Sequence, residues 1–123
     1  MTMTGSGRRE QPLTPAVLGV AGPLGERATL VHFSSAFCRP CAATRRVLAQ
    51  VAAMVPGVRH VEIDAEAHLE TVRALRITAT PTVLVLDAAG RTVRRAAGMP
   101  RKADVIAALG EAVRDPADAP TDA

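Results

Sequence analysis

The sequence predicts an α/β domain with a central mixed sheet of four or five strands and helices on both faces. Segments with strand-like and helix-like apolar spacing alternate along the chain, as in sheets covered by helices. The continuous apolar run at 82–86 is typical of a strand covered on both faces. A turn at 87–90 separates this run from 91–96, which predicts an antiparallel hairpin within the sheet.

The remaining elements follow from local patterns. A first helix over 13–20 is expected to begin with Thr14 as its N-cap and Pro15 in its first turn. The long helix ends before Pro56-Gly57, a pair that stops helices. The other expected elements, in chain order, are a strand at 29–33, a helix at 41–54, a strand at 58–63, a helix that begins at Asp64, and a helix at 100–113.

Length and composition indicate one domain with an aliphatic core. The chain has 123 residues, 48% of them hydrophobic, and its aromatic residues are Phe33 and Phe37. Few aromatics disfavour a module that stacks bases, and the net charge of +3 is spread along the chain, so we expect no nucleic-acid partner. The apolar runs are too short to cross a bilayer, so we expect no membrane association. Nothing in the pattern indicates an obligate dimer, and we expect a monomer.

The two ends of the chain differ in composition from the middle. We expect a disordered polar leader over 1–11, a domain over 12–114 and a disordered acidic tail over 115–123. Arg8-Arg9 precedes a mildly apolar stretch that faintly resembles a twin-arginine export signal, but Pro and Gly interrupt the stretch and no clean cleavage site follows. We therefore expect a cytoplasmic protein, with export as the alternative.

Cys38 and Cys41 form a C-x-x-C motif where a predicted buried strand leads into the long helix. This spacing implies a local redox or metal site rather than a disulfide framework. The N–H groups and partial positive charge of a helix N-terminus stabilise a thiolate, Arg39 adds a cation, and Pro40 suits the first turn. We expect Cys38 to be the nucleophile. Cys41, about one turn further and more sheltered, then resolves the mixed disulfide.

A zinc half-site is the alternative use of this spacing. Zinc takes four ligands, and His32 and His60 are the residues available to complete the set, because the chain has no second cysteine pair. Both histidines lie on strands predicted to be buried, and Pro40 suits a redox motif. We therefore expect no metal and no organic cofactor, since the disulfide of Cys38 and Cys41 carries both electrons itself.

Several motifs occur in a fixed order over about four-fifths of the chain, from Leu13 to Val113. They are the strand at 29–33, the aromatic-C-x-P-C motif at 37–41, the strand ending in Asp at 61–64, the proline segment at 79–82, and two late glycines, Gly90 and Gly98. In this order they resemble the thioredoxin family. The resemblance implies the thioredoxin fold and a protein-disulfide reductase that works by dithiol–disulfide exchange.

The resemblance also implies roles for residues around the cysteines. Pro81 is expected to be cis and to pack beside them, with the backbone of Thr80 pairing to an extended substrate segment. Phe37 is expected to form part of an apolar lip around Cys38, and Gly98 to leave room for substrate. Proline as the second residue between the cysteines resembles reducing members of the family. The substrate-binding residues implied are Phe37, Arg39, Pro40, Thr80, Pro81 and Gly98.

The chain departs from the family pattern beside the motif. Phe37 stands where the family has a Trp, and Ser34 where a second Trp is expected. The buried acid of the family falls at His32, and the Lys often opposite it falls at His60. We hypothesise that His32 is catalytic and takes the proton from Cys41 during resolution, because an ordinary imidazole pKa near 6.5 suits this task. A buried structural histidine is the alternative.

The expected partners are client proteins with disulfides and an electron donor, either a thioredoxin-reductase-like protein or a low-molecular-weight thiol. Such a protein serves electron transport and cell redox homeostasis. Two alternatives stay open: an exported reductase that matures extracytoplasmic proteins, and a non-catalytic binding module whose cysteines act as a redox sensor. We expect a group of charged side chains to lie on solvated helix faces. The other interpretation of the arginines among them is that they steer an acidic partner. The side chains are Arg45, Arg46, His68, Arg73 and Arg76.

Overall fold

The four strands form one mixed sheet in the order β2-β1-β3-β4. The computed structural model describes residues 11–114, so the expected acidic tail and all but the last residue of the expected leader lie outside the described residues. β1 pairs in parallel with β2, whereas the β1–β3 and β3–β4 pairs are antiparallel, which confirms the predicted mixed sheet and final hairpin. The strands are β1 (Ala28–Ser34), β2 (Val58–Asp64), β3 (Thr82–Asp87) and β4 (Thr92–Ala97).

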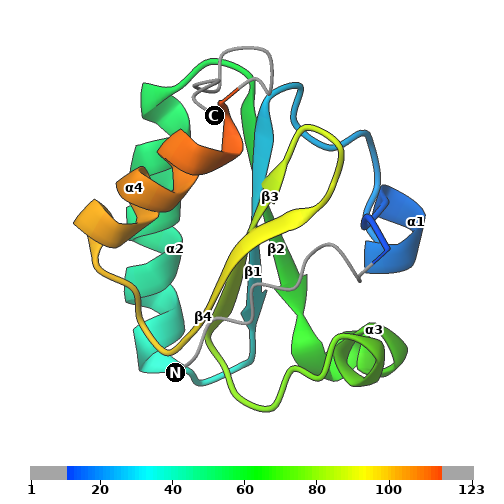
Figure 1. The fold of residues 1–123 in the computed structure, drawn as a ribbon. Coiled ribbons are helices and arrows are strands. Elements are labelled where there is room, and N and C mark those ends of the chain that lie inside the picture. The colour runs from blue at the N-terminus through cyan, green and yellow to red at the C-terminus, as the bar shows by residue number, and fades with distance from the viewer. Residues whose placement is uncertain (1–10, 115–123) are drawn as a thin grey trace.

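Helices cover both faces of this sheet, as predicted. Figure 1 shows α2 (Arg39–Met54) and α4 (Lys102–Ala112) on one side, and α1 (Pro15–Leu18) and α3 (Leu69–Ala74) on the other. Each side has its own apolar cluster of buried side chains. None of the helices in the described range is long and apolar enough to cross a membrane.

β1 lies between β2 and β3 and separates the two clusters. Leu30 packs in the cluster beneath α2 and α4, whereas Val31 and Phe33 pack in the cluster beneath α1 and α3. Side chains alternate between faces along a strand, so His32 and Ser34 leave β1 on the same side as Leu30. This alternation places two polar side chains under α2, the helix that begins at the cysteines.

The predicted helix at Asp64 is wrong in its starting point. Strand β2 runs through Asp64, whose carboxylate accepts a hydrogen bond from the Glu66 N–H at 2.9 Å and caps a short 3-10 turn, η2 (Ala65–Ala67). α3 begins only at Leu69, after His68. His68 is half-buried, with Nδ1 3.0 Å from the carbonyl oxygen of Asp64, and it lies between η2 and α3 rather than within the predicted helix.

The predicted first helix is also too long at its end. The Thr14 side chain accepts a hydrogen bond from the Val17 N–H at 3.1 Å, which confirms Thr14 as the N-cap. Gly19 adopts a left-handed φ of 74° and closes the helix after Leu18. Glycine takes this conformation without the steric penalty of a Cβ, which explains the early end.

Candidate active site

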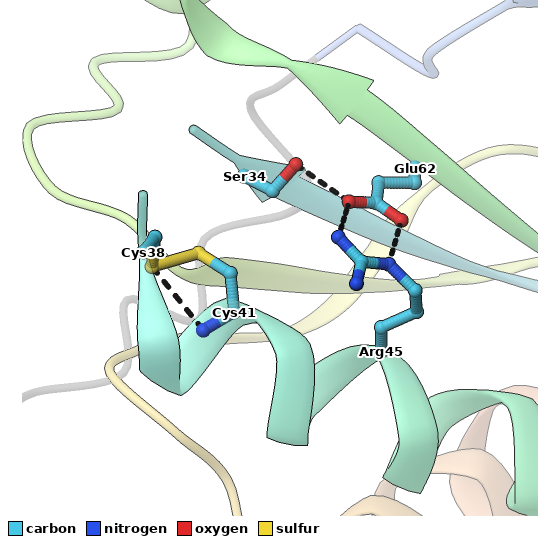
Figure 2. Close-up of polar contacts among 5 residues, drawn as sticks. All are labelled: Ser34, Cys38, Cys41, Arg45 and Glu62. Carbon is cyan, nitrogen blue, oxygen red and sulfur yellow. Dashed lines mark hydrogen bonds and ion pairs between the residues drawn. A yellow bond between two sulfur atoms is a disulfide. The ribbon is translucent and has the colours of Figure 1, made fainter. Parts of the chain in front are cut away.

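Cys38 lies where the chain leaves β1 and enters α2. It is the N-cap of α2, and its Sγ accepts a hydrogen bond from the Cys41 N–H at 3.2 Å. Cys38 and Cys41 form a disulfide, shown in Figure 2 at the end of the helix. Arg39 and Pro40 occupy the first turn between them, so the predicted strand-to-helix placement of the motif is confirmed.

The two sulfurs differ in their access to the surface. Cys38 is half-exposed, whereas Cys41 is 1% exposed and faces the sheet. The hydrogen bond from the Cys41 N–H and the positive end of α2 both favour negative charge on the sulfur of Cys38. One sulfur is thus reachable from outside and lies where negative charge is favoured, while its neighbour is sheltered from attack.

Two further segments converge on the cysteine loop. The Thr80–Pro81 peptide bond is cis, as predicted. The hydroxyls of Ser35 and Thr80 lie 2.8 Å apart and join the loop before Cys38 to the segment before β3. The Gly98 N–H donates to the carbonyl oxygen of Pro81 at 2.8 Å and fixes the end of β4 to the same segment. Sequence reasoning missed Ser35, because its partner lies 45 positions away.

Exposed residues flank Cys38 in the chain, and the surface at Gly98 is open. Phe37 is fully exposed, with a left-handed φ of 60°, and Arg39 is exposed on the other side of Cys38. Gly98 has a φ of 91°, and apart from its chain neighbours no atom of residues 11–114 lies within 4 Å of the position where a Cβ would stand, so its surroundings are open. Met99, which the sequence analysis did not select, is 57% exposed next to Gly98.

A charged network lies one turn of α2 past the buried Cys41 (Figure 2). The Arg45 guanidinium donates two hydrogen bonds of 2.6 Å to the Glu62 carboxylate, which also accepts one of 2.7 Å from the Ser34 hydroxyl (Figure 2). Arg45 is one turn past Cys41, so α2, β1 and β2 meet here. Arg45 lowers the pKa of Glu62 to about 2, and Ser34 adds to this effect, although burial opposes it. Arg45 is exposed on a face of α2, as predicted, but the sequence did not reveal its ion pair with Glu62.

Two histidines lie in the same layer. His32 is fully buried and His60 half-buried, and their rings stack with centroids 6.4 Å apart. Within residues 11–114, neither ring nitrogen of His32 has a hydrogen-bond partner. Burial lowers the pKa of His32 to about 4, with smaller contributions in the same direction from His60 and Arg45, while Glu62 raises it. The assumed pKa near 6.5 is thus wrong, and His32 is neutral at pH 7.

The half-buried His60 behaves in the same way, since burial lowers the pKa of its imidazole. Neutral imidazoles are metal ligands as well as bases, so the zinc alternative requires the two histidines to be grouped with the two cysteines. Among the residues that the structure describes, no three His, Cys, Asp or Glu side chains are grouped so that they could hold a metal ion.

This fold and this disulfide define a thiol–disulfide oxidoreductase with the thioredoxin fold. The family model for the thioredoxin-like domain matches residues 15–113, and the chain belongs to that family. No curated protein matches the chain.

Solved thioredoxin structures share the fold. A mutant thioredoxin from Halobacterium salinarum is 17% identical, with a TM-score of 0.66 over 73% of this chain and 78% of its own. Chloroplastic thioredoxin z is 29% identical, with a TM-score of 0.62 over 70% of this chain and 78% of its own. Fasciola hepatica thioredoxin is 22% identical, with a TM-score of 0.62 over 72% of this chain and 83% of its own.

Proposed function

We propose that this protein reduces disulfides in client proteins, with Cys38 as the attacking sulfur and Cys41 as the resolving one. The observation that carries the proposal is the unequal access of the two sulfurs: Cys38 is half-exposed at the N-cap of α2, whereas Cys41 is buried one turn further on. A client sulfur can therefore approach Cys38 but not Cys41. Attack on the client by Cys38, followed by resolution by Cys41, is the order in which exchange through a mixed disulfide would then proceed.

The reaction has two exchange steps. The Cys38 thiolate attacks a client disulfide, a Cys38–client disulfide forms, and one client sulfur leaves as a thiolate. Cys41 then loses its proton and attacks Cys38, the internal disulfide closes, and the second client sulfur leaves as a thiolate. Two electrons pass to the client, and an external dithiol donor or two small thiols must return them to Cys38 and Cys41. No metal or organic cofactor takes part in this scheme.

The second step needs a proton acceptor in a buried place, and we assign this role to His32. Cys41 and His32 are both buried between α2 and the sheet. Both ring nitrogens of His32 are free of hydrogen bonds within the described chain, so the imidazole can accept a proton without breaking one. Its pKa of about 4 keeps it unprotonated at neutral pH, although the same low pKa makes it a weak base.

Clients would bind across the surface next to Cys38. Phe37 supplies an exposed apolar ring and Gly98 leaves open space, and the proposal assigns the backbone of Thr80 to pair with an extended client segment. The matching partner is a flexible client segment that contains a disulfide and an apolar side chain. The proposed client-binding residues are Phe37, Arg39, Pro40, Thr80, Pro81 and Gly98, and the proposed form in solution is a monomer.

Reduction of insulin disulfides, with dithiothreitol as donor, tests the proposal. The wild type is expected to accelerate the reaction catalytically, and Cys38→Ser to return it to the uncatalysed rate. Cys41→Ser, which removes the other sulfur in the same way, is expected to accumulate a stable mixed disulfide on Cys38 that mass spectrometry detects. A protein that cycles between dithiol and disulfide without accelerating insulin reduction would be a redox sensor instead.

His32→Ala tests the proton acceptor separately. The rate of client release from a preformed Cys38–client disulfide is expected to fall in this variant across pH 6 to 8, while the first attack by Cys38 is unchanged. Equal release rates in the variant and the wild type over this range would show that His32 takes no part in resolution.

A further inference from the structure

Glu62 brings a fixed negative charge next to the buried imidazole of His32. The two residues are register partners in the parallel β1–β2 pair, so their side chains leave neighbouring positions on one face of the sheet. Three hydrogen bonds, two from Arg45 and one from Ser34, hold the Glu62 carboxylate in place and in its ionised form. Glu62 therefore stays anionic over the whole range in which His32 changes its charge.

Few charged or titratable groups face His32. β2 contributes Glu62 and His60, and α2 contributes Arg45, while the buried Cys41 lies one turn before Arg45 on the same helix. The register partner of His32 on β3 is the apolar Val83. Within this set, Glu62 favours a protonated imidazole, whereas Arg45 and His60 disfavour it.

We propose that Glu62 is the counter-ion of His32 during resolution, a positioning residue that acts on the sulfurs only through the imidazole. This inference rests on the proposed function. In the resolving step the proton of Cys41 moves to His32, the Cys38–Cys41 bond forms, and the Cys38–client bond breaks with the client sulfur leaving as a thiolate. A positive charge thus arises in a buried site, and a neighbouring carboxylate stabilises it.

Arg45 has two effects of opposite sign on this charge. It holds Glu62 in position through two hydrogen bonds of 2.6 Å, and its own positive charge opposes protonation of His32. Loss of Glu62 and loss of Arg45 should therefore act on His32 in opposite directions, although each removes the same ion pair. A mere clamp between α2 and β2 predicts something else: either loss would loosen the contact, admit water and raise the pKa of His32 in both variants.

Titration of the His32 ring by NMR in the reduced protein distinguishes these cases. Glu62→Gln is expected to lower the midpoint of His32, and Arg45→Gln to raise it. Glu62→Asp, which keeps the charge, should stay close to the wild type. Glu111→Gln is the matched control, because Glu111 accepts two hydrogen bonds of 2.9 Å from an arginine, Arg94, on the β4–α4 side. It should leave the midpoint unchanged. A midpoint that rises or stays constant in Glu62→Gln overturns the proposal.

Client release from a preformed Cys38–client disulfide is the kinetic readout. Glu62→Gln is expected to slow release by at most roughly three- to tenfold, the change that lowering the pKa of His32 by about half to one unit makes in the equilibrium of proton transfer. Arg45→Gln is expected to release no more slowly than the wild type, and Glu111→Gln at the wild-type rate. Equal slowing by Glu62→Gln and Arg45→Gln would identify a clamp and overturn the proposal. A wild type that reduces no disulfide refutes the proposed function instead, and the titration still decides the role of Glu62.

Discussion

Over residues 31–34 the two faces of strand β1 are equally buried and chemically opposite. Val31 and Phe33, both fully buried, point into the apolar cluster beneath α1 and α3. His32, also fully buried, and Ser34, 6% exposed, point under α2 beside the charged pair of Glu62 and its arginine. Four consecutive residues thus alternate between an apolar layer and a polar one, with no difference in access to solvent to explain it.

This contrast separates the part of the core that stabilises the fold from the part to which we assign the proton transfer. Burial of Val31 and Phe33 contributes the free energy of removing apolar surface from water. Burial of His32 without a hydrogen-bond partner opposes folding, because a desolvated polar group loses its contacts with water. Buried titratable groups with strongly perturbed pKa values cluster at functional sites, and this one lies in the layer that also contains Cys41.

The largest expected effect is on the apolar face. Phe33→Ala is expected to lower the free energy of unfolding by about 3–5 kcal/mol, since Phe33 is fully buried and its removal leaves a cavity. Urea denaturation followed by circular dichroism measures this change. The fraction that stays folded should still form the Cys38–Cys41 disulfide. A loss below about 1 kcal/mol would contradict the assignment of this face as the stabilising one.

Acid should act through the polar face. Burial lowers the pKa of His32 from 6.5 to about 4, so between these values the unfolded chain binds more protons than the folded one. The contribution of His32 to the free energy of unfolding is therefore fully present above pH 6.5. It falls on acidification, by roughly 2–3 kcal/mol by pH 4.5. His60 adds a change of the same sign.

The window for this measurement is set by Glu62. Its pKa is lowered from 4.5 to about 2, so its own contribution is lost only below about pH 4.5, under both pH values of the measurement. Urea denaturation at pH 7 and pH 5 should show the fall in the wild type and a smaller fall in His32→Leu. An unchanged pH dependence in His32→Leu would mean that a group other than His32 binds the protons responsible for the fall in stability.

The fold was predictable from the sequence because burial leaves a local period. The apolar run of β3, the helical spacing of α2 and the position of the two cysteines between β1 and α2 are visible in short windows. The network of Ser34, Arg45 and Glu62 is not, since Glu62 lies 28 positions from Ser34 and 17 from Arg45, and the three meet only when the register of β1 and β2 is set. Nor does a sequence reveal how far desolvation moves the pKa of His32.

At neutral pH, replacing His32 on the polar face by an apolar residue should raise the free energy of unfolding. His32→Leu fills a similar volume and removes two buried nitrogens without partners, so unfolding is expected to require about 1–2 kcal/mol more. The same change should slow client release from the Cys38–client disulfide. Stability would then rise as activity falls, which is the signature of a residue retained for function. A less stable His32→Leu would indicate that the imidazole has partners in solution and serves the structure.

The smallest effect is expected for the other arginine–glutamate ion pair of the described chain that is joined by two hydrogen bonds. Arg94 and Glu111 join β4 to α4 with hydrogen bonds of 2.9 Å, and their side chains are 48% and 44% exposed. Water screens such a pair, so Arg94→Gln is expected to change the free energy of unfolding by less than about 0.5 kcal/mol and to leave insulin reduction unchanged. Arg45 is 50% exposed and Glu62 28%, which is similar geometry in another setting. Of these two ion pairs, only Arg45–Glu62 adjoins a buried imidazole. A change in client release caused by Arg94→Gln would therefore mean that any surface charge acts on the sulfurs. The distinction between the two faces of β1 would then lose its chemical basis.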